Sequence, residues 1–456
     1  MMFNYRCKPL AILLVIVFAA THHADAQKPL SLKECLDYAS TNNRNIKISG
    51  YELEVSKRKV YEQYGAYLPQ VSISGSLDDN LKLNKQLLPA EMFGGTPGTY
   101  KAVSFGTKYN LSTSAQLTQS LYDPQFWVNL RSVKNSKLLS EQSLKKTQEQ
   151  VSYSISVRYF QALIAQKQLD VLKTTLGASE ESLKSAELRR KNGMAKQLDV
   201  DKLRVSFNNT QSMLKQAELS YKQAINNLKF QMGMPLDSTI ALPEAIPNFS
   251  FEKDGSEISS TTIEARSDYQ MLKTNLVQLE IDRKKSIASY LPTLSFYGNY
   301  GYSAMNQEFK FYESDQRWFN SSSVGLKLSI PIFSGFQRYH RLNQSKLNLA
   351  KGQENLKLNE QSIKLEISNY QVQYLNALDN IKNESENYEL AKRVYESTQL
   401  ECKQGISTAL DLVQAESALR EAQNSYFNKL LNLYIAKIDL EQSKGNLQSF
   451  INSQIR

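Results

Sequence analysis

Four stretches of the chain alternate apolar and polar residues with a period of two, which predicts β-strands. They span residues 70–78, 107–122, 293–303 and 323–333. In the first, valine, isoleucine and leucine alternate with serine. A membrane-spanning strand needs about 9–11 residues, with lipid-facing apolar positions alternating with polar ones. The pattern therefore favours strands of a transmembrane barrel over an ordinary antiparallel sheet with one face on a core.

One side of these strands is predicted to face lipid and the other to face water. The large apolar residues on the lipid side are Leu111, Leu117, Leu294, Phe296, Leu326 and Leu328. Ser112 and Ser295 belong to the opposite side. The helices carry a different pattern, so no amphipathic helix is left to cover such a sheet. This is the main argument against the alternative of a packed sheet.

Apolar and small residues spaced four and three apart predict helices packed side by side. The first such seam consists of Leu203, Phe207, Thr210, Leu214, Ala217, Tyr221, Ala224 and Leu228. It recurs 212 residues later, with Lys429 as its one charged member. Two long helices, 125–190 and 336–402, are predicted before the seams because proline is absent from them. At 1.5 Å per residue each is roughly 100 Å long, which no globular core requires.

The chain contains two copies of one arrangement. The motif Leu68-Pro69, followed by Gly75, recurs 223 residues later as Leu291-Pro292, followed by Gly298. Each copy is predicted to run helix, strand, loop, strand, very long helix, tight turn and helix. The first copy is predicted to have the longer loop, because residues 78–107 hold Gly94-Gly95, Pro97 and Gly98.

The ends and the middle of the chain complete the predicted organisation. Arg6 and Lys8 precede an apolar stretch and an Ala-Asp-Ala site, which indicates a secretory signal peptide that leaves Gln27 first. The predicted segments are the signal peptide 1–26, the first repeat 27–231, a proline-bearing linker 232–261, the second repeat 262–447 and a tail 448–456.

Composition excludes several classes of function. The net charge is +10, but the basic residues are dispersed among polar ones in an exported chain, so nucleic acid is not expected as a partner. Three cysteines cannot form a disulfide framework, and Cys35 and Cys402 are predicted to be free thiols. His340 is the only histidine after the signal peptide, and no glycine-rich phosphate loop is present. We therefore predict no catalytic residues, no metal site, no cofactor and no enzymatic activity.

Taken together, these motifs resemble the TolC family of outer-membrane efflux proteins over about residues 29–447. The resemblance rests on the opening at 30–43, the doubled Leu-Pro-x-x-Ser-x-x-Gly, the segment 328–335 and the doubled glycine turn that ends in Leu-Asp. It implies an α+β membrane protein that forms a homotrimer. Each chain would give four strands to one shared twelve-stranded β-barrel in outer-membrane lipid, and coiled-coil-like helices to a long periplasmic α-barrel.

The resemblance also implies a function and partners. The family provides the outer-membrane channel-tunnel of tripartite efflux or type I secretion systems. It is a passive duct, opened by a periplasmic adaptor protein and an inner-membrane pump. The alternative is a periplasmic coiled-coil adaptor or structural envelope protein. Adaptors carry one helical hairpin, whereas two hairpins and four long strands are predicted here, which favours the channel.

By the same resemblance, the two glycine turns form the tip that contacts the adaptor. The residues at these turns are Lys191, Gly193, Met194, Lys403, Gly405 and Ile406. Glycine suits a helix reversal because the turn needs a positive φ. The turns are thus ordinary helical-hairpin turns as well. The Leu-Pro motifs, with Gly75 and Gly298, mark the entry of the chain into strands.

The resemblance further places a pore constriction beside the second turn. Asp411 matches the first of two ring-forming aspartates of the family, and the second position holds Gln414. Asp199 matches an aspartate that latches the entrance, whereas the partner positions of that latch hold Cys402 and Ser407. A gate held in a different way is therefore expected. The alternative for Asp411 is a helix-start carboxylate stabilised by the helix dipole.

Overall fold

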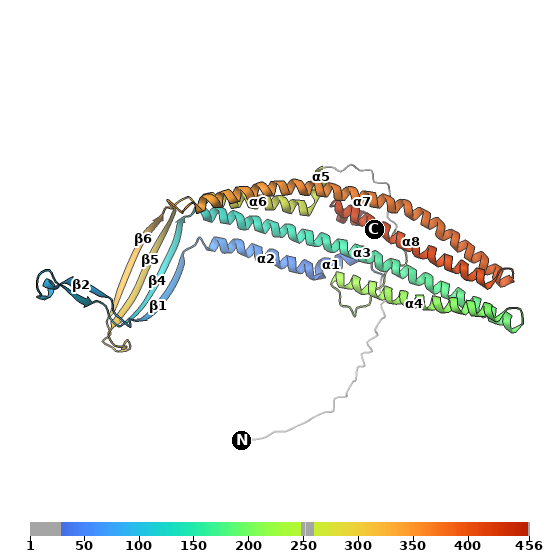
Figure 1. Ribbon diagram of the computed structural model, residues 1–456, viewed down its shortest axis with the longest axis horizontal. Helices are drawn as coiled ribbons and strands as arrows, with labels where there is room; N and C mark the ends of the chain where they lie inside the picture. The colour runs from blue at the N-terminus through green and yellow to red at the C-terminus, as the bar shows by residue number, and fades with distance from the viewer. Residues whose placement is uncertain (1–28, 248–250, 252–259, 455–456) are drawn as a thin grey trace, which may run out of the picture.

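The computed structural model describes residues 29–247, 251 and 260–454 of the 456 residues. The predicted signal peptide and part of the predicted linker lie outside the described residues. The molecule is elongated, with a four-stranded sheet near one end, helices along its length and two helix reversals at the other end (Figure 1). Within the described part of the chain, none of the helices is long and apolar enough to cross a membrane.

The elements follow the predicted order in both copies. The first copy comprises α1 (Leu32–Asn42), α2 (Arg44–Gly65), β1 (Gln70–Asp79), β4 (Tyr109–Tyr122), α3 (Pro124–Lys191) and α4 (Gln197–Met232). The second comprises α5 (Ser260–Ala265), α6 (Ser267–Ala288), β5 (Thr293–Asn306), β6 (Trp318–Ser329), α7 (Gln337–Gln404) and α8 (Ala409–Ser443). The heptad seams keep α3 against α4 and α7 against α8.

Three sequence predictions need correction. Residues 78–107 are not a plain loop, because β2 (Lys85–Pro89) and β3 (Tyr100–Ser104) pair as a hairpin around the short helix η1 (Ala90–Phe93). The last strand is β6, not 323–333, since Pro331 has no N–H for the ladder and aromatic residues extend the other end. The predicted tail contains a helix, α9 (Leu447–Gln454).

The sheet sorts apolar and polar side chains onto two faces. Its order is β1-β4-β5-β6, antiparallel throughout. One cross-strand row joins Val71, Leu117, Gly298 and Val324, and the adjacent row joins Ser72, Gln116, Asn299 and Ser323. All six residues predicted to face lipid therefore share one face, while Ser112 and Ser295 lie on the other.

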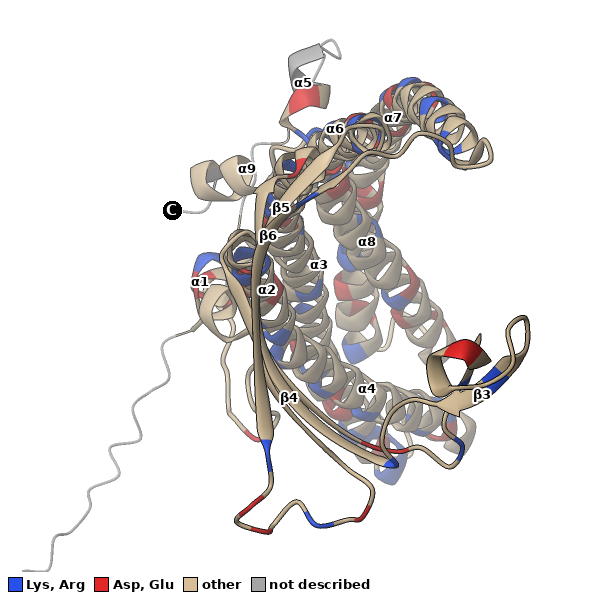
Figure 2. Ribbon diagram, turned by 90° about the vertical axis from the view of Figure 1, so that its left-hand side faces the viewer, with Lys and Arg blue, Asp and Glu red and all other residues tan. Residues whose placement is uncertain are grey.

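The helices continue the sheet as one layer with two open edges. α2 packs on α3, α3 on α6 and α6 on α7, which repeats the order of the strands attached to them. The outer elements are β1 and α2 on one side, and β6 and α7 on the other. Viewed along the long axis, the sheet and helices describe an arc rather than a closed ring (Figure 2).

The largest core lies where the short helices meet the long ones. Fully buried side chains of α1, α3, α4 and α8 meet there, among them Cys35, Tyr159, Phe160, Leu228 and Ile438. Both Cys35 and Cys402 are free thiols. Burial, reinforced by the nearby Glu34 carboxylate, raises the pKa of Cys35 to about 12, so this thiol remains protonated at neutral pH.

Each of the two repeats has an equivalent polar contact between its helices. Asn43, just before α2, donates its side-chain amide to the Gln231 carbonyl at 2.6 Å, near the end of α4. In the second copy, Arg266 precedes α6 and donates to the Ser443 carbonyl at 3.0 Å, at the end of α8. Each contact ties the start of one helix to the end of another.

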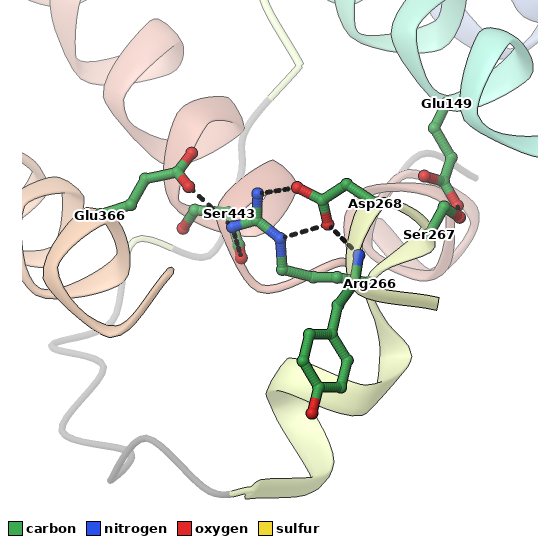
Figure 3. Close-up of polar contacts among 7 residues, drawn as sticks. Glu149, Arg266, Ser267, Asp268, Glu366 and Ser443 are labelled. Carbon is green, nitrogen blue, oxygen red and sulfur yellow. Dashed lines mark hydrogen bonds and ion pairs between the residues drawn. The ribbon is translucent and has the colours of Figure 1, made fainter. Parts of the chain in front are cut away.

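Arg266 forms ion pairs with two carboxylates (Figure 3). Its guanidinium contacts both oxygens of Asp268, at 3.0 and 2.7 Å, and Glu366 of α7 at 2.9 Å. Burial works against ionisation of Asp268, but the hydrogen bonds from Arg266 prevail and hold the pKa of that carboxyl below its usual value. The network joins α6, α7 and α8 into one unit.

Candidate functional site at the helical tip

The two helix reversals lie together at the end of the molecule farthest from the sheet (Figure 1). We call this end the tip: residues 181–210 of the first hairpin and 388–420 of the second. Apolar residues of both hairpins form one core beneath the turns, including Val200, Leu203, Tyr395, Leu412 and Leu419. The tip is therefore a single packed unit rather than two independent turns.

Glycine produces both reversals. Gly193 and Gly405 adopt φ of 70° and 83°, which residues with a side chain rarely adopt. The amide of Met194 then donates to the Arg189 carbonyl at 2.8 Å, and that of Ile406 to the Glu401 carbonyl at 2.9 Å. A Cβ at Gly405 would lie 2.6 Å from the Arg189 guanidinium, whereas one at Gly193 would meet nothing within 4 Å.

The outermost surface of the tip is partly apolar and partly basic. Met194 is 72% exposed and Ile406 is 73% exposed. Lys191 is exposed beside the first turn, and the Lys403 ammonium lies 3.9 Å from the Glu181 carboxylate. A partner that docks here would meet one large apolar side chain and one lysine from each turn.

Asp411 lies in the first turn of α8. Its carboxylate accepts from the Thr408 amide at 3.0 Å and the Thr408 hydroxyl at 2.6 Å, while its own amide donates to that hydroxyl at 3.2 Å. These hydrogen bonds from Thr408 lower the pKa of Asp411, so the carboxylate is ionised at neutral pH. The helix-start interpretation therefore has direct support, and the charge that a pore ring needs is present as well.

One predicted latch position, Cys402, is contacted by an arginine that the sequence prediction missed. Arg189 of α3 donates to the Cys402 carbonyl at 2.6 Å, which joins the two hairpins. Burial raises the pKa of the Cys402 thiol, Arg189 opposes that rise, and Asp199 and Asp411 add to it. The structure thus brings both aspartates near Cys402. The sequence feature that could have revealed Arg189 is the basic last turn of α3, because the helix dipole stabilises cations at the C-terminal end of a helix.

The other residues predicted at the entrance, Gln414 and Ser407, make no hydrogen bond to the other hairpin among the contacts described. Gln414 lies one turn beyond Asp411 on α8 and is exposed. The Ser407 hydroxyl donates weakly to the Asp411 carboxylate at 3.4 Å. Neither residue links the two hairpins through a contact that the structure describes.

A buried glutamate makes a second polar link between the hairpins. Glu416 of α8 is 2% exposed and accepts from Ser206 at 2.8 Å and from Thr210 at 3.0 Å, both on α4. Arg420 lies 3.5 Å from the same carboxylate and donates to Thr210 at 3.2 Å. The sequence feature that could have revealed this link is Thr210, because a hydroxyl within an apolar seam needs a polar partner.

The strand-entry motifs lie at the opposite end of the helices. Leu68 and Leu291 donate their amides to the carbonyls of Gly65 and Ala288, at 3.0 and 3.1 Å, and so end α2 and α6. The prolines that follow directly precede β1 and β5. Gly75 and Gly298 lie within these strands, on the apolar face. The described residues contain no group of three or more acidic, histidine or cysteine side chains that could hold a metal ion.

Comparison with known proteins identifies the family. The family model for outer membrane efflux proteins matches residues 36–234 and 260–446. The chain is 22% identical over 427 residues to the probable efflux pump outer membrane protein TtgC of Pseudomonas putida, covering 91% of this chain and 83% of the relative. It is 19% identical to the proteases secretion protein PrtF of Dickeya chrysanthemi, covering 71% and 68% of the two chains.

A solved structure has the same fold. CusC, whose crystal structures concern folding and transmembrane channel formation, matches with a TM-score of 0.71 and 16% identity over 92% of both chains. The family match covers both repeats and most of the chain. The chain therefore belongs to the outer membrane efflux protein family and is a protein of the outer membrane.

Proposed function

We propose that three copies of this chain form the outer-membrane channel-tunnel of a tripartite efflux or type I secretion system. The observation that carries this proposal is the open, curved layer with one edge at β1 and α2 and the other at β6 and α7. Unpaired edge strands are unfavourable, most of all in lipid, where backbone groups find no water. Four strands are too few to close a barrel, whereas twelve from three copies suffice.

The helical edges support association of copies. On α7, large apolar residues recur at intervals of seven and are exposed in the single chain: Leu358, Leu365, Val372 and, four heptads later, Leu400. On α4, Leu198, Val205 and Leu219 are exposed at intervals of seven and fourteen. Because α4 continues the α2 edge toward the tip (Figure 1), the two stripes lie on opposite edges, and each copy presents one to each neighbour. Such head-to-tail contacts generate a ring when the rotation closes.

The proposed duct works passively. The polar face of the sheet bears serine, asparagine and glutamine, with hydrogen bonds between Ser74 and Ser114 and between Ser76 and Ser112. This face would line water, and the apolar face would contact lipid. The tip would dock on a periplasmic adaptor, and an inner-membrane pump would supply the energy. Relatives named for efflux and for protease secretion leave both classes of cargo open.

An edge substitution tests the ring. Leu365→Glu should prevent assembly, because it places a charge in each apolar contact between copies, while Lys364→Glu, one residue away and also exposed, should not. Native mass measurement of detergent-extracted outer membranes would show trimers for the parent and for the Lys364 variant only. Trimers of normal yield from the Leu365 variant would contradict this edge as an interface. A monomeric parent protein would refute the trimer itself.

A second prediction concerns the entrance. Three Asp411 carboxylates around a narrow pore would attract cations, and the attraction strengthens as the local dielectric falls. Asp411→Asn should therefore reduce cation preference in bilayer recordings across a salt gradient, although the asparagine side-chain oxygen can still accept from the Thr408 amide. Gln414→Asp adds a second ring and should strengthen block by multivalent cations. If the asparagine variant keeps the parent's selectivity, Asp411 serves only as a helix cap.

A further inference from the structure

The hairpin formed by β2, η1 and β3 is the feature that the proposed duct does not explain. It forms a separate two-stranded sheet and projects beyond the four-stranded one (Figure 1). A two-stranded hairpin is at best marginally stable by itself in water. A hairpin of this kind needs another surface to pack on, and its side chains indicate which.

One face of the hairpin is apolar and uncovered in the single chain. Leu87 and Tyr100 are each 69% exposed, and the register places both on the face that also carries Pro89 and Ala102, with Lys85 and Ser104 at its end nearest the sheet. Lys101 lies on the opposite face. Met92 of η1 is exposed as well. Exposed apolar clusters on a water-facing segment usually mark a contact with another chain.

The charge of the hairpin selects among possible partners. Residues 80–108 carry four lysines, Lys82, Lys85, Lys101 and Lys108, against the single acid Glu91. The β5–β6 loop, residues 307–317, has the opposite balance: Glu308, Glu313 and Asp315 outnumber Lys310 and Arg317. The same loop exposes Phe309 and Tyr312, whose ring faces can accept lysine.

Topology brings these two segments of different copies together. The hairpin follows the edge strand β1 in the chain, whereas the β5–β6 loop precedes the opposite edge strand β6. In a ring, β1 of one copy lies beside β6 of the next, so the hairpin of one copy lies near the loop of its neighbour. Viewed along the long axis, the hairpin projects into the open side of the arc rather than away from it (Figure 2).

We infer that the hairpin packs on the β5–β6 loop of the next copy and narrows the outer mouth of the duct. Lys85, on the same face as Leu87, would meet Asp315, since Glu308 and Glu313 already pair with Lys310. The apolar face around Leu87 and Tyr100 would cover Phe309 and Tyr312. Lipid is disfavoured as the occupant because the hairpin lies on the inner side of the arc. This inference rests on the proposed trimer.

Disulfide trapping tests the contact. In a Cys402→Ser background, Lys85→Cys combined with Asp315→Cys should give covalent dimers and trimers on an oxidising gel, because Lys85 lies on the same face of the hairpin as Leu87. Each single variant should stay monomeric on that gel. Lys85→Cys with Lys285→Cys serves as the matched control, since Lys285 is exposed on α6, beyond the other end of β5. Native mass measurement of every variant establishes first that trimers are present.

The outcomes separate this inference from the proposed function. Trimers with cross-linking in the 85/315 pair and without cross-linking in the 85/285 pair would support the inference. Trimers without the 85/315 cross-link would overturn it. Cross-linking by Lys85→Cys alone would also overturn it, because the hairpins would then contact one another. A protein that forms no trimers before any cysteine is introduced would instead refute the proposed function.

Discussion

Alanine at Glu416 is expected to loosen the tip more than a change at any exposed tip residue. Removing one partner of a buried ion pair leaves the other charge without compensation and costs about 3–5 kcal/mol. Here Arg420 would lose its counterion, and the hydroxyls of Ser206 and Thr210 would lose their acceptor. Hydrogen exchange measured by mass spectrometry should show lost protection in the tip halves of α4 and α8, with the sheet unaffected.

Two further variants distinguish charge from packing. Glu416→Gln keeps an acceptor for one hydroxyl and should lose less protection than alanine. Glu416→Leu combined with Arg420→Leu removes both charges and should recover part of the loss, since apolar replacement of a buried pair is often neutral. If alanine at Glu416 leaves exchange at the tip unchanged, the cluster does not hold the hairpins together.

The same cluster bears on how the entrance would open. Within the described tip, Glu416 joins α8 to α4, and Arg189 joins α3 to the end of α7. Both links cross from one hairpin to the other, so separation of the hairpins must break them. Of the two predicted latch partners, Cys402 takes part in these links through its backbone carbonyl, which accepts from Arg189. Ser407 contacts only its own hairpin in the contacts that the structure describes.

The repeat pattern and the helices could be predicted because they follow from local sequence. Each strand has one apolar and one polar side, so period two is visible within 7–13 residues around positions such as Val71 and Leu117. The register then follows, since a slip by one residue would move every apolar side chain to the polar face. The long helices lack proline, and glycine marks both reversals.

Other features depended on contacts between distant residues and could not be predicted. Arg189 and Glu416 look like ordinary surface charges on helices until α8 is placed against α3 and α4. Arg266 occupies the position of Asn43 in the other copy, so no similarity of residue type reveals their shared role. The β2–β3 hairpin was obscured by Gly94, Gly98 and Pro97, which form its turn but are typical of loops.

The apolar face of the sheet gives the other large expected effect. Val324 lies near the middle of β6, is exposed in the single chain and pairs across the sheet with Gly298. Val324→Arg would place a charge in the hydrocarbon, which costs about 2–4 kcal/mol at the bilayer midplane and less near the interfaces. We expect a marked fall in the folded protein recovered from outer membranes and a matching loss in refolding yield into lipid vesicles.

The adjacent residue supplies the control for this prediction. Ser323 pairs with Asn299 on the polar face, and the same strand already carries Lys327 on that side without a lipid contact in the proposed barrel. Ser323→Arg adds the same side chain to the same strand one residue away, so any general effect of arginine on β-propensity or translation is shared. Its recovery should stay near that of the parent. Equal losses from both variants would mean that both faces are packed against protein, and the sheet would then not be a lipid-facing barrel wall.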